Sequence, residues 1–193
     1  MEKNLLYFKK CIVLFSILLS LFSCEAKKTN SENMELNGVL DYNWDTTIDD
    51  IKELFTDNNY SNIHIDIDDS TISANFVYND FISKIVLWYF DNKISSGTIS
   101  IKNIDELKRE ELNNIEEKLF SILKSNYGEP QLFKDIDKDF RVYEWKFINN
   151  CTVELYFNCL NYFSVESKDF VWNIIFIAYN NWDIMNTYND QQN

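Results

Sequence analysis

The chain has 193 residues, of which 31 are acidic and 18 basic, so its formal net charge at pH 7 is −13. A surface of this charge repels nucleic acid and anionic lipid head groups, which argues against a nucleic-acid partner. Only three glycines and one histidine are present. Neither a glycine-rich phosphate loop nor a zinc site of clustered histidines is therefore predicted, and no cofactor is expected.

The first 23 residues have the three parts of a bacterial export signal. Lysines among the first ten residues are followed by an apolar run from Cys11 to Ser23, and Cys24 comes directly after this run. The run is shorter than the roughly 20 apolar residues that a membrane-spanning helix needs. We therefore predict that residues 1–23 are a signal peptide that is removed. Its loss would change the formal net charge from −13 to −15, because it holds three lysines and one glutamate.

The segment Leu21-Phe22-Ser23-Cys24 resembles the lipobox of bacterial lipoproteins, although the family usually has a smaller residue where Phe22 stands. The resemblance implies cleavage before Cys24, attachment of diacylglycerol to its sulfur and usually a third acyl chain on the new N-terminus. Two or more chains make a stable anchor to a membrane of the cell envelope, on its periplasmic or surface face. The alternatives are an ordinary secretory signal with an incidental cysteine, or an uncleaved anchor.

The mature chain is predicted to contain one domain. Residues 24–40 are polar and lack periodicity, so we expect a flexible tether with a reach of roughly 20 Å. Residues 41–183 have the size of a single domain, and residues 184–193 are expected to be a disordered tail. If Cys151 and Cys159 lie on one strand, they are too far apart for a disulfide, and we expect two buried thiols.

In the first half of the domain, a short helix is predicted to begin at Thr46-Thr47 and to end near residues 57–59. Asp49 and Asp50 in its first turn suit the positive end of the helix dipole. Alternating apolar side chains then predict extended strands. The ranges are Ile63–Ile67, Ile72–Tyr78, Ile82–Phe90 and Ile94–Ile101, and tight turns are predicted at residues 78–81 and 91–93.

In the second half, a long helix is predicted from about Asp105 to Tyr127, ended by Gly128 and Pro130. The strands after it are predicted at Phe140–Phe147, Cys151–Phe157 and Trp172–Tyr179. We interpret the pattern as an α+β fold of two α-β-β-β units that form one mostly antiparallel sheet with two helices on one face. The pattern is explained equally well by duplication of one unit whose two copies have since diverged in sequence, or by a common arrangement of helices that cover a sheet.

Two phrases in these elements resemble known domains. The stretch Trp44 to Leu54 and the sequence Tyr127-Gly-Glu-Pro130 are similar to helix starts and stops in small lipoproteins of outer-membrane assembly and in proteinaceous inhibitors of β-lactamase. Both segments consist of residues that cap helices, so the resemblance bears on the fold more than on function.

The candidates for catalysis and metal binding are few. His64 alternates with Ile63 and Ile65, which predicts a surface histidine rather than a general base. The acidic runs at residues 66–69 and 135–139 lack the glycine and glutamate of a calcium loop, so we interpret both as solvated turns and expect no metal. Glu144 and Glu154 on adjoining strands are a possible carboxylate pair for glycoside hydrolysis.

Aromatic residues are the compositional feature that bears most on function. The stretches 85–90 and 171–177 are apolar on both strand faces, more than a sheet with one wet face requires. Loops or the tether can cover the second face, or it is open to a partner. We predict Trp88, Phe90 and Tyr156 as partner-binding residues of a non-catalytic lipoprotein that binds another envelope protein. The alternatives are an envelope hydrolase with a carboxylate pair, and a small-ligand or glycan binder that uses exposed aromatic side chains.

Overall fold

The computed structural model describes residues 30–58, 60–137, 139–164 and 167–192. The predicted signal peptide, the lipobox and Cys24 lie outside the described residues. Within the described ranges, no helix is long and apolar enough to cross a membrane.

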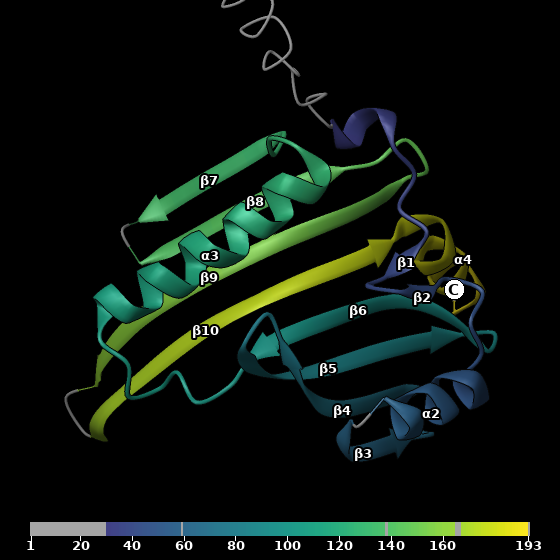
Figure 1. The fold of residues 1–193 in the computed structure, drawn as a ribbon, viewed down its shortest axis with the longest axis horizontal. Helices are drawn as coiled ribbons and strands as arrows, with labels where there is room; N and C mark the ends of the chain where they lie inside the picture. Colours follow the sequence, from purple (N-terminus) through teal and green to yellow (C-terminus); the bar gives the residue numbers. More distant parts are fainter. Residues whose placement is uncertain (1–29, 59, 138, 165–166, 193) are drawn as a thin grey trace, which may run out of the picture.

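The protein has a mixed α+β fold dominated by one antiparallel sheet. The strands of this sheet are β3 (Ser61–Asp66), β4 (Thr71–Tyr78), β5 (Phe81–Phe90), β6 (Lys93–Ile101), β7 (Leu132–Asp137), β8 (Phe140–Lys146), β9 (Cys151–Ser164) and β10 (Ser167–Asn181). They lie in the order β3-β4-β5-β6-β10-β9-β8-β7 (Figure 1). A 3-10 turn, η1 (Ser31–Asn33), and a small two-stranded sheet of β1 (Gly38–Val39) and β2 (Tyr42–Asn43) precede it.

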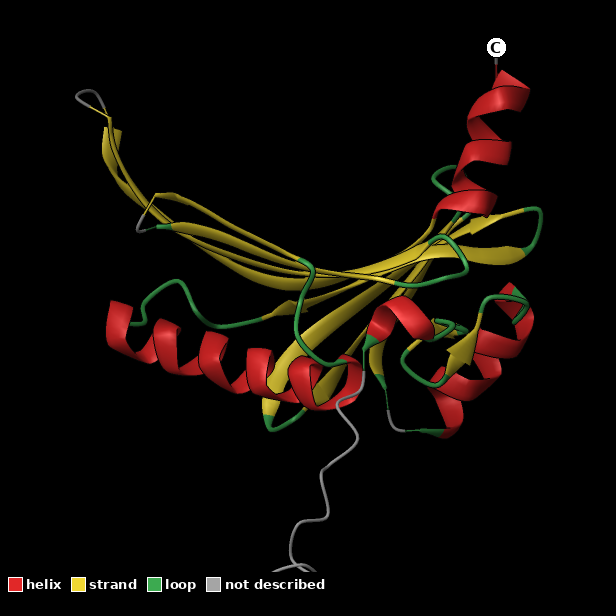
Figure 2. Cartoon of the chain, turned by 90° about the horizontal axis from the view of Figure 1, so that it is seen from above, coloured by secondary structure: helices red, strands yellow, loops and turns green. Residues whose placement is uncertain are grey.

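The helices lie on both sides of the large sheet. They are α2 (Ile48–Asp57), α3 (Arg109–Tyr127) and α4 (Trp182–Gln192). Helices α2 and α3 cover one face, and α4 stands on the opposite face, toward which the sheet curves (Figure 2). We call the face that carries α2 and α3 the helix face, and the opposite one the open face.

The α+β class and the antiparallel sheet are confirmed, but the predicted count of three strands after each helix is wrong. Four strands follow α2 and four follow α3. In the first half, β3 (Ser61–Asp66) is a fourth strand of the sheet, at one edge. In the second half, the fourth strand is β7 (Leu132–Asp137) at the other edge, which the sequence did not predict. Strand β7 is an edge strand, which pairs on one side only and so needs fewer apolar residues to mark it. That the two halves are copies of one unit stays a prediction.

The predicted helix ends are close to the observed ones because capping chemistry sets them. Thr47 is the N-cap of α2: its Oγ1 accepts from the Asp50 amide and its own amide donates to the Asp50 carboxylate, both at 3.3 Å. Helix α3 begins at Arg109, later than predicted, and ends at Tyr127, with Gly128 as its C-cap at a φ of 83°. The Gly128 amide donates to the Lys124 carbonyl at 2.9 Å, so glycine is used here for its positive φ.

The turns of the first meander also follow from their residues. Asn79 and Asp80 both have positive φ, 48° and 71°, and Tyr78 pairs with Phe81 across them. Asp91 and Asn92 repeat this geometry with φ of 50° and 61°. Two-residue hairpins need positive φ at both positions, and Asn and Asp tolerate it better than other side-chain-bearing residues.

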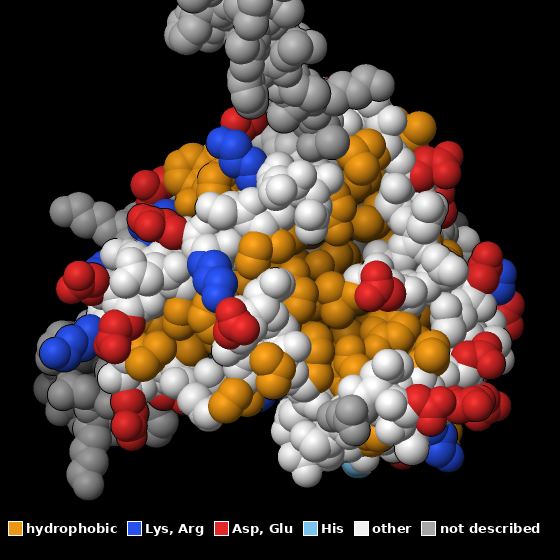
Figure 3. Space-filling view, in the orientation of Figure 1, with side chains coloured by type: hydrophobic (Ala, Val, Ile, Leu, Met, Phe, Trp, Pro, Cys, Tyr) orange, Lys and Arg blue, Asp and Glu red, His pale blue; other side chains and the backbone are white. Residues whose placement is uncertain are grey.

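The hydrophobic core lies between the helix face of the sheet and the helices α2 and α3 that cover it. On β9, Val153, Leu155 and Phe157 are fully buried. Cys151 and Cys159 continue the same alternation as free, buried thiols on one strand, which confirms the prediction made for them. Apolar side chains also gather in a strip between α3 and α2 on this face (Figure 3).

The N-terminal boundary of the domain lies earlier than the predicted residue 41. Leu36 and Val39 are buried in the core, and the Trp44 indole nitrogen donates to the Leu36 carbonyl at 2.7 Å. A Cβ at Gly97 would lie 2.8 Å from Val39 Cγ2, so the missing side chain lets β1 pack directly against β6. Part of the segment predicted as a tether is therefore a structural element.

The C-terminal segment also differs from its prediction. Residues 184–193 were expected to be disordered, but α4 runs from Trp182 to Gln192. Its first turn is held by polar contacts with the β8–β9 end of the sheet: the Trp182 indole donates to Thr152 Oγ1 at 3.2 Å, and the Asn150 amide donates to Asp183 at 2.8 Å. In its first turns Trp182, Asp183, Asn186 and Thr187 are exposed, which accounts for the polar composition there.

Candidate functional site

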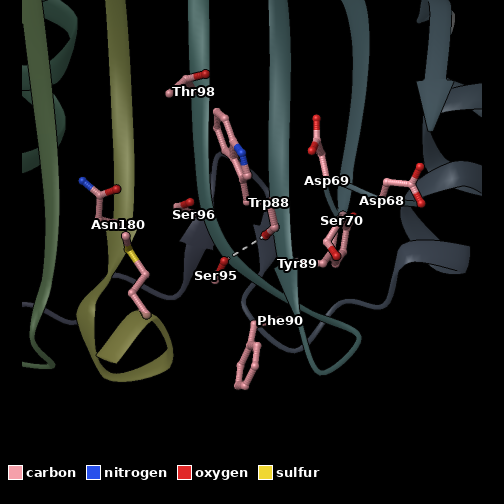
Figure 4. Close-up of a pocket in the computed structure, with 11 residues that line it drawn as sticks. Asp68, Asp69, Ser70, Trp88, Tyr89, Phe90, Ser95, Ser96, Thr98 and Asn180 are labelled. Atoms are coloured by element: carbon pink, nitrogen blue, oxygen red, sulfur yellow. Dashed lines mark hydrogen bonds between the residues drawn. The ribbon is translucent and has the colours of Figure 1, made fainter. Parts of the chain in front are cut away.

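The open face carries a hollow beside α4, which we call the Trp88 hollow. It has a volume of about 580 Å³. Its lining comes from the β3–β4 turn, β5, β6, β10 and α4: Asp68, Asp69, Ser70, Trp88, Tyr89, Phe90, Ser95, Ser96, Thr98, Asn180 and Met185. Figure 4 shows the Trp88 ring between Asp69 and the β6 residues Ser96 and Thr98.

Backbone pairing positions Trp88 at this place. It lies opposite Thr71 of β4 and Ser96 of β6, and the register of β5 and β6 shifts directly after it. The Ser95 hydroxyl donates to the Trp88 carbonyl at 3.2 Å, and the Tyr89 amide donates to the Ser70 carbonyl at 2.9 Å. The extra residue of this irregularity is Ser95 of β6, which lies between the pairs Trp88–Ser96 and Tyr89–Ile94.

The wall formed by the β3–β4 turn is acidic. The Asp66 carboxylate accepts from the amides of Asp68 and Asp69, both at 3.1 Å, so Asp66 holds the turn and the next two carboxylates project from it. Asp68 and Asp69 are exposed and take part in none of the ion pairs formed by the described residues. The side chain of Trp88 is 36% exposed. An aromatic face beside free carboxylates suits a cationic group.

The predicted partner-binding residues divide between two places. Trp88 and Phe90 both line the hollow. Tyr156 also faces the open side, but it is three strands from Trp88 in the sheet order and does not line the hollow. It stacks on Phe176 with ring centroids 4.4 Å apart, and its hydroxyl donates to Glu154 at 2.6 Å. Burial and the Glu154 carboxylate raise the pKa of Tyr156.

A second hollow on the open face lies at the other end of β4 and β5, and we call it the Lys84 hollow. Its volume is about 470 Å³. It is lined by Asn62, His64, Ser73, Asn75, Ile82, Lys84, Lys102 and Asn103. His64 is exposed, as predicted. The sequence did not indicate this hollow, because its residues come from three strands and a loop that only strand pairing brings together.

The carboxylates of the possible hydrolase pair are neighbours on the open face. Glu144 of β8 lies directly opposite Glu154 of β9. Each has a polar partner: Lys146 Nζ lies 3.7 Å from Glu144, and the Tyr156 hydroxyl donates to Glu154. Neither glutamate lines the Trp88 hollow or the Lys84 hollow.

The acidic runs at residues 66–69 and 135–139 do not form a metal site, and the second run was wrongly predicted to be a turn, because Asp135 and Asp137 belong to β7. Among the described residues, no group of three or more His, Cys, Asp or Glu side chains is arranged to hold a metal ion. In the second acidic run, Asp139 pairs with Arg109 at the start of α3.

Comparison with known proteins adds no relative. No protein-family model, no curated protein and no solved structure matches this chain.

Proposed function

We propose that this chain is an exported lipoprotein, anchored through lipid on Cys24, whose domain binds a segment of another envelope protein without catalysing a reaction. The observation that carries the proposal is the Trp88 hollow. It combines a large, exposed aromatic side chain with a polar and acidic rim on a sheet face that α4 covers only in part. Aromatic residues at the centre of a polar rim are typical of protein-binding sites.

The surroundings of the hollow, rather than its size, favour a protein segment as the ligand. About 580 Å³ lies within the range for small-ligand pockets. The surrounding face is broad and shallowly curved (Figure 2), so a ligand that fills the hollow can continue along the strands. A protein segment makes such an extended contact.

Replacement of the anchor cysteine tests the first half of the proposal. Cys24→Ala should move the protein from the membrane fraction to the soluble fraction and abolish labelling by radioactive fatty acid. The circular dichroism spectrum and the thermal midpoint of the domain should not change, because Cys24 precedes the predicted domain of residues 41–183. Retention of the Cys24→Ala protein in the membrane fraction would contradict lipid anchoring.

Site-specific crosslinking tests the second half. A photoreactive phenylalanine analogue at position 88 should capture one envelope protein in stoichiometric yield from intact cells. The same analogue at Lys52, an exposed position on α2 of the helix face, is the matched control and should capture none. Equal capture from both positions, or none from position 88, would contradict binding at the Trp88 hollow.

A carboxylate-pair hydrolase is the second candidate, because Glu144 and Glu154 are direct cross-strand neighbours. Directly opposed residues in an antiparallel pair have Cβ atoms roughly 5 Å apart, so the two carboxylates can approach one another, as the paired acids of a glycosidase do. If this function holds, the purified protein should hydrolyse chromogenic glycosides, and Glu144→Gln or Glu154→Gln should each abolish the turnover. The preferred binding function predicts no turnover in any of the three proteins.

We also propose that the two halves of the domain derive from one unit. Each half is a helix followed by a four-stranded meander, and the last strands of the halves, β6 and β10, pair antiparallel at the centre of the sheet. From either edge of the sheet to its centre, the strands of one half therefore follow one another in the order in which they occur along the chain. This arrangement supports duplication of the unit with four strands rather than three.

A further inference from the structure

The two hollows of the open face carry charges of opposite sign. Asp68 and Asp69 are the charged residues of the Trp88 hollow, whereas Lys84 and Lys102 are those of the Lys84 hollow. Neither lysine takes part in an ion pair of the described residues. Two unpaired cations in one hollow are notable in a chain with a net charge of −13, in which nearby carboxylates are plentiful.

The pairing register sets the distance between the hollows. Trp88 and Lys84 lie four residues apart on β5 and point to the same face, so their Cα atoms are separated by about 13 Å along the strand. Val86 lies between them, opposite Ser73 of β4 and Thr98 of β6. The strip between the hollows therefore carries one apolar side chain flanked by two small hydroxyl side chains.

We propose that the two hollows together bind one extended protein segment that carries a basic and an acidic side chain four residues apart. An extended segment places residues i, i+2 and i+4 on one side, with i and i+4 about 13 Å apart, the same spacing as the hollows. The basic side chain lies against Trp88 and the Asp68 and Asp69 carboxylates. The acidic side chain accepts hydrogen bonds from Lys84 and Lys102, and the residue between them contacts Val86. This inference rests on the proposed protein-binding function and specifies its partner.

Charge complementarity is the reason for choosing this occupant. A uniformly acidic segment would be repelled at the Trp88 hollow, and a uniformly basic one would be repelled at the Lys84 hollow. Asn62, Asn75 and Asn103 add further hydrogen-bonding groups around the two lysines. An aromatic ring and carboxylates at the other end bind ammonium or guanidinium groups by cation–π and ionic contact.

Synthetic peptides and full-length protein in detergent micelles test the inference. A fluorescent peptide of small residues with Lys and Glu four positions apart should bind, and fluorescence anisotropy measures its Kd. A peptide with the same composition but the two charges adjacent should bind at least about threefold more weakly, because it can satisfy only one hollow. Raising the salt concentration should weaken the first complex.

A charge swap identifies the contact. Lys84→Glu should weaken binding of the Lys/Glu peptide, and a Lys/Lys peptide of the same spacing should recover it, because the new carboxylate pairs with the second lysine. Lys52→Glu on α2 changes the net charge by the same amount on the other face and is the matched control. It should leave the preference between the two peptides unchanged.

Failure of this inference can be distinguished from failure of the proposed function. No binding of the Lys/Glu peptide up to about 1 mM, equal affinity for the two charge spacings, or no change of preference in Lys84→Glu would overturn the inference. In that case crosslinking from position 88 still decides whether the hollow binds a protein of other chemistry. Loss of that crosslink as well would overturn both.

Discussion

At the scale of single residues, α3 and β8 are joined by a largely buried ion pair, in which two charged side chains are removed from water. The Glu116 carboxylate is 5% exposed and pairs with Arg141, which is 22% exposed. The Tyr143 hydroxyl donates to Glu116 at 3.1 Å, and Arg141 also donates to Asn113 at 2.9 Å. Burial raises the pKa of Glu116 above its usual value, although Arg141 and Tyr143 act to lower it.

Two substitutions at this pair should have unequal effects on stability. Arg141→Met should lower the free energy of unfolding at pH 7 by about 3 kcal/mol, because it leaves a buried carboxylate without its cation. Glu116→Gln should cost much less, because it removes the charge that burial disfavours and keeps an acceptor for Tyr143. Urea unfolding of both variants measures the difference, and an equal loss in the two would contradict this reading.

The raised pKa of Glu116 also predicts a pH dependence. The folded state binds this proton more tightly than the unfolded state, so the stabilisation is full below the usual glutamate value and is lost as pH rises through the raised pKa. The Glu116→Gln variant has no carboxyl at this position, so its stability does not fall with pH for this reason. The stability difference between wild type and Glu116→Gln should therefore move in favour of the variant between pH 4 and pH 7.

At the scale of elements, the segment before residue 41 belongs to the domain. Leu36 and Val39 are buried, and the Met34 carbonyl accepts from the Ile148 amide at 3.1 Å. Without this segment the Trp44 indole loses its acceptor, the Leu36 carbonyl. Short β1 and η1 are thus held by contacts with distant strands rather than by their own propensity.

Two N-terminal truncations test this boundary. A chain that begins at Asn30 should unfold cooperatively, whereas one that begins at residue 41 should lose about 3–5 kcal/mol of stability from the missing Leu36 and Val39 side chains and the unpaired indole. Thermal and urea unfolding measure the loss. Identical midpoints for the two chains would return the boundary to the predicted residue 41.

At the scale of the whole molecule, the fold sets which side of the sheet is nearer to the proposed anchor. The turn η1 lies on the same side of the sheet as α2 and α3 (Figure 2). Both hollows are lined by open-face residues, on the other side of the sheet. Cys24 precedes Asn30 by six residues, which span at most about 20 Å. If lipid is attached to Cys24, as proposed, we expect the helix face to lie toward the membrane and the open face to be directed away from it.

A fluorescence experiment checks this orientation. A fluorophore on Lys52→Cys of the helix face should be quenched by spin-labelled lipid more strongly than one on Lys84→Cys of the open face. The labelled proteins should be reconstituted in vesicles with the anchor intact, and their Cys24→Ala forms should show no quenching at either position. Stronger quenching from the open face would place the hollows against the membrane.

The sequence alone determined the features of this domain that depend on neighbouring residues. Thr47 with Asp50, Gly128, and the Asn-Asp and Asp-Asn hairpins define helix ends and turns through local backbone geometry and hydrogen bonds. Alternation along a single strand likewise predicted that His64 faces solvent, and it does.

The tertiary structure alone decided what depends on pairing between distant segments. The edge strand β7, the packing of β1 on Gly97 and the place of α4 on the open face carry weak local signals, because distant partners hold them. The same applies to the site: strand register brings Trp88 close to Asp69 and Asn180, gathers Lys84 and Lys102, and keeps Tyr156 apart. Side-chain alternation specifies a face, but only strand order and register specify which residues on that face are neighbours.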